Sequence, residues 1–112
     1  MEKTIKVGNR EIRFKATAAT PMHYRNMFKG QDIFRDLMKI KESGTETEIL
    51  ESIDFGTFER IAYIMSDDRR NGVGFEDWLD SFEVMDIVSI LPEIMELWEI
   101  NMDTQSIAPK NR

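Results

Sequence analysis

Residues 3–16 read Lys-Thr-Ile-Lys-Val-Gly-Asn-Arg-Glu-Ile-Arg-Phe-Lys-Ala, and apolar side chains alternate with polar ones on both sides of Gly8-Asn9. A tight two-residue turn needs positive φ, which glycine and asparagine tolerate. We therefore predict a β-hairpin over 3–16. A lone hairpin is barely stable in water, so its apolar face must pack on the rest of the chain. That face carries Ile5, Val7, Ile12, Phe14 and Ala16.

The sequence after the hairpin is typical of helices, because apolar residues recur there every three or four positions. Thr20 suits the N-cap of the first helix and Pro21 suits its first turn. Pro92 lies inside the last helical segment, where its ring would clash with the preceding turn, so we expect a kink or a break near Leu91. The predicted helices span about 21–29, 32–40, 50–66, 75–82 and 85–102.

The remaining segments are polar and lack periodicity. Residues 41–48 are interpreted as a mobile loop, residues 67–72 as a solvated charged turn, and residues 103–112 as a disordered tail. A length of 112 residues fits one domain. The predicted fold class is α+β: mainly α with an N-terminal β-hairpin, forming a small single-domain bundle of about five helices over residues 1–102.

The net charge of −6 hides a division along the chain. Residues 1–42 contain ten Lys or Arg and five Asp or Glu, a net charge of +5, whereas residues 43–112 contain five and sixteen, a net charge of −11. Such asymmetry suits nucleic acid, a membrane surface, or contact between copies of one protein. A pI near 4.8 disfavours nucleic acid as the principal partner. No segment approaches the ~20 apolar residues of a bilayer span, and the N-terminus lacks the apolar core of a signal peptide, which favours the cytosol.

Motifs of catalysis are missing from the sequence. There is no cysteine, no glycine-rich phosphate loop, and His23, the single histidine, has no nucleophile or ligand partner near it in sequence. Asp67-Asp68 belong to an acidic cluster, but Arg69-Arg70 would oppose a calcium ion there. We expect no catalytic, metal or cofactor site, and hence no enzyme.

Methionine is frequent, with eight residues in the chain. Methionine is over-used on surfaces that accept varied partners, because its side chain adapts its shape. Helical spacing favours the simpler interpretation that the internal methionines fill the core: Met22, Met27, Met38, Met65, Met85 and Met95. Apolar residues nevertheless crowd residues 82–102 beyond what one side of a helix can hold, which predicts association with another chain.

Three blocks of the sequence resemble, in order, the tail assembly chaperones of long-tailed (siphovirus-type) phages and prophages of Gram-positive bacteria. The first is the hairpin followed by TPMHYRNMF at 20–28 and GQD at 30–32. The second is IAYIM at 61–65 leading to FEDWLDSF at 75–82, and the third is LPEIMELW at 91–98. The resemblance covers about residues 3–100.

The resemblance implies a non-enzymatic protein of the host bacterial cytoplasm that is absent from the mature virion. It would bind the tape measure protein, keep it soluble and help recruit tail tube protein, and it would self-associate into a spiral or ring. The candidate partner-binding residues are Tyr24, Phe28, Trp78, Met95 and Trp98, each of which suits core packing equally well. Three alternatives stay open: a generic helical adaptor, an antitoxin-like interaction protein, and an acidic mimic of DNA.

The charge division suggests how copies would meet. The basic hairpin and early helices of one subunit would contact the acidic C-terminal helices of the next, head to tail. A contact between two different surfaces builds a ring or a helix instead of closing as a dimer.

Overall fold

The computed structural model describes residues 1–43 and 55–99, which form a hairpin and seven helices. The predicted fold class is confirmed. Residues 41–43, predicted as the start of a mobile loop, are helical instead. The rest of that loop, the start of the predicted third helix at 50–54, the end of the predicted last helix at 100–102 and the predicted tail at 103–112 lie outside the described residues. The helices are α1 (Thr20–Met27), α2 (Ile33–Ser43), α4 (Phe55–Met65), α5 (Asp67–Arg70), α6 (Phe75–Asp80), α7 (Val84–Ser89) and α8 (Leu91–Leu97).

The hairpin forms as predicted. Strands β1 (Glu2–Val7) and β2 (Arg10–Lys15) pair antiparallel, with Ile5 opposite Ile12. Gly8 has a φ of +64°. Positive φ at the first turn position is what a type II′ hairpin turn requires, and glycine adopts it without a steric penalty.

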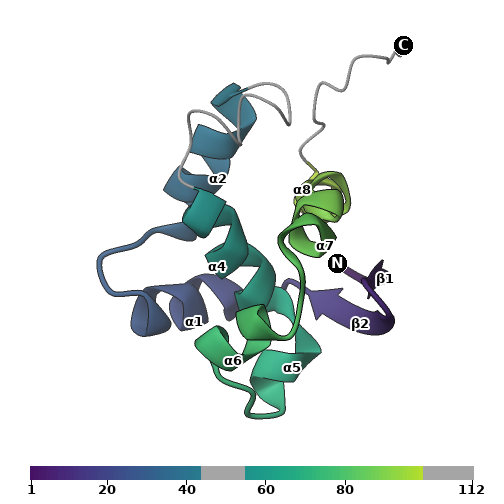
Figure 1. Ribbon diagram of the computed structural model, residues 1–112. Helices are drawn as coiled ribbons and strands as arrows, with labels where there is room; N and C mark the ends of the chain where they lie inside the picture. The colour runs from purple at the N-terminus through teal and green to yellow at the C-terminus, as the bar shows by residue number, and fades with distance from the viewer. Residues whose placement is uncertain (44–54, 100–112) are drawn as a thin grey trace.

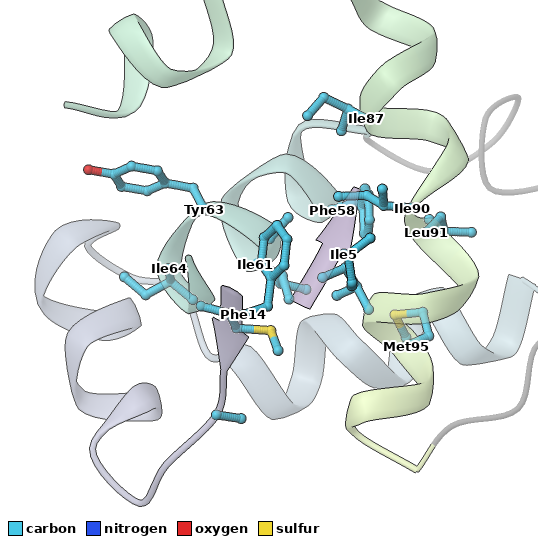
Figure 2. Close-up of a cluster of buried hydrophobic side chains, with 14 of the residues drawn as sticks. Ile5, Phe14, Phe58, Ile61, Tyr63, Ile64, Ile87, Ile90, Leu91 and Met95 are labelled. Atoms are coloured by element: carbon cyan, nitrogen blue, oxygen red, sulfur yellow. The ribbon is translucent and has the colours of Figure 1, made fainter. Parts of the chain in front are cut away.

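The core lies between the apolar face of the hairpin and the helices. Helix α4 runs through the middle of the molecule, with the hairpin, α7 and α8 on one side and α1 and α2 on the other (Figure 1). Figure 2 shows Ile5 of β1 near Phe58 and Ile90, with Leu91 farther along the same helical segment. All four side chains are at most 2% exposed, so burial of the hairpin face provides the packing that a hairpin alone lacks.

The C-terminal helical segment is divided into α7 and α8. Ile90 ends α7 and precedes α8, and Pro92 lies in the first turn of α8, where its missing N–H leaves no hydrogen bond unmade. The predicted break near Leu91 is therefore confirmed, whereas a single helix over 85–102 is wrong, since α8 ends at Leu97. The bend lets both halves reach the core: Ile87 and Met95 are each at most 2% exposed.

Two local predictions are wrong. Thr20 does not cap α1: its Oγ1 accepts a hydrogen bond from the N–H of Thr17 at 2.9 Å and so closes the connector, while Ala19 precedes the helix without a side-chain cap. The segment predicted as a charged turn begins with helix α5, which Ser66 caps by accepting a hydrogen bond from the N–H of Arg69. Ser66 also pairs with Phe14 as an isolated bridge and thereby occupies the outer edge of β2.

Candidate functional site

Three of the five candidate partner-binding residues lie in the core. Tyr24, Trp78 and Met95 are 0% exposed, so a partner has no access to them in this conformation. Phe28 and Trp98 are partly buried and pack against the same core. Tyr24, Trp78 and Met95 are placed as their core-packing interpretation requires, and a binding role for them stays a prediction.

The two partly buried aromatics are each held by a ring contact. Phe28 meets Phe75 edge-on at 5.2 Å between ring centroids. Trp98 meets Phe34 edge-on at 6.0 Å, and its indole N–H points to the sulfur of Met65 at 3.1 Å. Trp98 thus joins the end of α8 to α2 and α4, with part of its surface still accessible.

Most of the internal methionines are not in the core. Met65 and Met95 are fully buried, as the core interpretation requires. Four others have relative exposures of 44% to 66%, so for them the core interpretation is wrong. These four exposed methionines are Met22, Met27, Met38 and Met85.

Helix α2 carries the first exposed apolar surface, which we call the α2 surface and define as Phe34 and Met38. Phe34 is 57% exposed and Met38 is 44% exposed, and a spacing of four residues places them on the same side of the helix. The opposite side of α2 is buried through Ile33, Leu37 and Ile40. Basic residues accompany the α2 surface along the helix: Arg35, Lys39 and Lys41.

Helix α7 carries the second exposed apolar surface, which we call the α7 surface and define as Val84 and Met85. Their exposures of 70% and 66% are the highest among the large apolar residues of the described chain. An open pocket of about 480 Å³ lies beside them, between the hairpin turn and the start of α7. The residues that line it are Val7, Gly8, Asn9, Arg10, Ser81, Phe82, Glu83 and Asp86.

Ion pairs join the basic hairpin to the acidic second half within one chain. Lys3 Nζ lies 3.1 Å from Glu93 Oε1 on α8, and Arg13 Nε lies 3.3 Å from Asp67 Oδ2 on α5. Arg10 Nη2 lies 2.8 and 3.0 Å from the two carboxylate oxygens of Asp68. The head-to-tail hypothesis gave these hairpin cations to a neighbouring subunit, but here they are paired internally.

Asp68 is also more than the solvated turn residue that the sequence predicted. Its side chain is 13% exposed, and its Oδ2 accepts a hydrogen bond from the indole N–H of Trp78 at 3.1 Å in addition to the Arg10 contacts. Asp68 therefore connects β2, α5 and α6. The signal in the sequence was weak, since an acidic pair next to an arginine pair is equally common on solvated surfaces.

A buried polar contact fixes α1 against α2. The hydroxyl of Tyr24 donates to Asp36 Oδ2 at 2.7 Å, and the Asp36 residue is 2% exposed. Burial, followed by the hydrogen bond to Asp36, raises the pKa of Tyr24 above its usual range near 10. Arg60 of α4 acts in the opposite direction and also lies 5.9 Å over the ring of Phe28. The contact is a structural hydrogen bond between helices, because both residues are at most 2% exposed.

Side chains suited to metal binding do not gather in the described part of the chain, where no group of three or more His, Cys, Asp or Glu residues is placed to hold an ion. His23 lies partly exposed in the first turn of α1. Within residues 1–43 and 55–99, no helix combines the length and the apolar character that crossing a bilayer requires. The features that remain as candidate sites are the two exposed apolar surfaces and the pocket.

Comparison of the chain with protein-family models, with curated proteins and with solved structures found no match. Function is therefore inferred from the residues and the geometry of this chain.

Proposed function

We propose that this protein is a tail assembly chaperone of the long-tailed phage type, which binds the tape measure protein through exposed apolar side chains and keeps it soluble. The observation that carries the proposal is the placement of methionine and phenylalanine outside the core. Phe34 and Met38 form an apolar surface on a helix whose other side is fully packed. Burying such side chains on a client gains about 1.5–3 kcal/mol for each fully buried residue.

The chemistry of the α2 surface suits a chaperone better than a partner with one fixed shape. Methionine has three rotatable side-chain bonds and a polarisable sulfur, so it repacks against varied apolar side chains. A long coiled-coil client presents many such side chains in repeating register. On this proposal the protein acts in the host cytoplasm, helps recruit tail tube protein and leaves before the virion matures.

Self-association into a spiral or ring is part of the same proposal. The hairpin cations Lys3, Arg10 and Arg13 are paired within the chain, so a charged contact between copies would use the other basic residues of the hairpin and those of α1 and α2. Such a contact weakens with salt, because the Debye length falls from about 10 Å at 0.1 M to about 3 Å at 1 M. Equal oligomer masses by light scattering at both salt concentrations would contradict a charged contact.

Co-expression tests the proposal. The tagged chain is expressed with the long coiled-coil protein encoded beside its gene, and the soluble, co-purified fraction of that protein is measured. A Phe34→Ser/Met38→Ser variant should lose most of the solubilised client. Val73→Ser, which alters an apolar residue with 37% exposure outside both surfaces, is the matched control and should behave as wild type.

The outcome separates chaperone from adaptor. Circular dichroism must first show that the double variant keeps its helices, since Phe34 also contacts Trp98. If the coiled-coil protein stays insoluble with wild-type chain while one small protein co-purifies from the phage-carrying host, the adaptor or antitoxin-like function replaces the chaperone.

A further inference from the structure

Val84 and Met85 of the α7 surface are apolar although both are exposed and neither belongs to the core. Helix α7 is anchored in the core by Ile87, and Ile90 follows it, each at most 2% exposed. Val84 and Met85 lie in the first turn of the same helix and face solvent. Polar residues at positions 84 and 85 would leave the core unchanged. Packing within the described residues therefore does not account for the apolar character of the α7 surface.

The pocket beside the α7 surface is a fixed structure. The backbone of Gly8 approaches Asp86 so closely that a Cβ at this position would lie 2.8 Å from Asp86 Oδ2. The same carboxylate oxygen accepts a hydrogen bond from the backbone N–H of Glu83 at 3.0 Å and so secures the start of α7. The hairpin turn and α7 therefore hold the two walls of the pocket at a set separation.

Phe82 gives the pocket an apolar wall, and Arg10, the cation that lines the pocket, is already paired with Asp68. The guanidinium of Arg10 lies 5.5 Å over the ring of Phe82 and is held there by its two contacts to Asp68. The half-buried ring of Phe82 adjoins the α7 surface in sequence through Glu83. Phe82 thus lines the pocket, and the exposed Val84 and Met85 follow it in the first turn of α7.

The segment of the chain that carries the α7 surface has charges of one sign. Residues 71–99 contain eight Asp or Glu and no Lys or Arg. Glu93 and Glu96 are engaged by Lys3, whereas Asp80 and Glu83 are exposed and Glu83 lines the pocket. A partner that brings lysine or arginine beside its apolar residues is favoured, and one that brings carboxylates is repelled.

Strand addition is a poor mode of binding here. The outer edge of β2 is occupied at Phe14 by Ser66, and β1 lies against α7 and α8. An amphipathic helix needs no free strand edge and presents apolar residues with charged ones on either side.

From these features we infer that the α7 surface and the adjoining pocket form a docking site for a basic amphipathic helix of a partner protein. Apolar residues of that helix cover Val84, Met85 and Phe82, while its lysines or arginines reach Asp80 and Glu83. This site is distinct from the α2 surface, which is itself accompanied by basic residues, and it does not depend on the identity of the client.

Synthetic peptides test the inference on the full chain. The probe is an 18-residue leucine–lysine peptide arranged as an amphipathic helix. One control peptide replaces each lysine with glutamate, and a second scrambles the sequence so that no apolar face forms. Calorimetry should show binding of the first peptide at least tenfold tighter than of either control. NMR shifts should concentrate on Phe82, Val84 and Met85.

Surface variants assign the binding. Val84→Ser/Met85→Ser should weaken the peptide at least tenfold, and Asp80→Asn/Glu83→Gln should weaken it severalfold and flatten its salt dependence. Asp86 is left intact because it supports α7, and Glu83→Gln keeps a side-chain oxygen with which residue 83 can cap the same helix. The matched controls are Met22→Ser, an exposed methionine on α1, and Glu11→Gln, an exposed carboxylate on β2; both should bind as wild type.

Three results would overturn the inference. The first is equal binding of the lysine and glutamate peptides, and the second is equal loss of affinity in the α7 variants and the control variants. The third is a homo-oligomer that dissociates in the Val84→Ser/Met85→Ser variant and that the peptide binds only after dissociation. That result would assign the surface to a second copy of this chain.

Discussion

Replacing Asp68 with alanine should destabilise the protein by about 2–3 kcal/mol. The carboxylate accepts two hydrogen bonds from Arg10, at 2.8 and 3.0 Å, and one from the indole of Trp78, at 3.1 Å. Trp78 is fully buried, so its N–H would lose its acceptor, which costs about 1–3 kcal/mol. Arg10 is 48% exposed, so solvent screens its ion pair and limits it to roughly 0.2–1 kcal/mol.

Asp68→Asn separates the two contributions. The amide oxygen still accepts from the Trp78 indole but no longer balances the charge of Arg10, so the variant should lose only about 1 kcal/mol or less. Glu96→Ala is the control: this side chain is 69% exposed, 3.7 Å from Lys3, and its loss should cost less than about 0.5 kcal/mol.

Urea unfolding followed by tryptophan fluorescence and circular dichroism gives the three free energies. A total stability of about 5–15 kcal/mol makes a loss of 2–3 kcal/mol easy to resolve. If Asp68→Ala and Glu96→Ala differ by less than about 0.5 kcal/mol at equal m values, the Asp68 contacts do not hold the hairpin and α6 to α5 as described.

Further predictions concern exposure, turn geometry and pH. Brief peroxide treatment followed by mass spectrometry should oxidise the four exposed methionines well before Met65 and Met95; comparable rates would contradict the described burial. Gly8→Ala should lower the free energy of unfolding by at least ~1–2 kcal/mol, because φ is +64° and the added Cβ would press on the carboxylate of Asp86. Gly74→Ala, where a Cβ meets open space, should change the free energy of unfolding little in the same urea assay. The pKa of Tyr24 is raised on folding, so its contribution to stability is complete below pH 10 and is lost as the pH rises through its folded-state pKa. Urea unfolding at pH 9 and pH 11 should therefore show a steeper loss for wild type than for Tyr24→Phe, and parallel losses would count against the raised pKa.

Local patterns predicted the elements of this fold well. The alternation around Gly8 and the break near Leu91 each depend on a few adjacent residues, and both are found. The errors at Thr20 and α5 are also local, but there two interactions compete. The hydroxyl of Thr20 can cap a helix or bind the connector, and its bond to the N–H of Thr17 is the one that forms.

The candidate site was harder to predict because helical periodicity shows which residues share a side, not which side faces the core. Trp78 and Met95 carry large apolar side chains suited to binding, yet both are buried. Phe34 and Met85, which received no binding role from the sequence, are exposed. Only the position of α4 and of the hairpin decides between these outcomes, and that is set by contacts between residues far apart in the chain.

The internal ion pairs could not be predicted from the sequence for the same reason. Lys3 and Glu93 are separated by 90 positions but lie 3.1 Å apart. The charge division along the sequence predicts a contact between two subunits. Within the fold, part of it instead joins the first strand to the last described helix.

The order of synthesis gives the hairpin a further property. Its strands are synthesised before the helices, yet β1 packs against α7 and α8. At about 5–20 residues per second, the ribosome needs roughly 4–17 s to add the intervening ~85 residues. During that interval β1 lacks its contacts with α7 and α8, so the apolar face of the hairpin is only partly covered and the hairpin is less stable. A nascent chain arrested before α8 should therefore be a substrate for general cellular chaperones, and the described fold is complete only when α8 emerges.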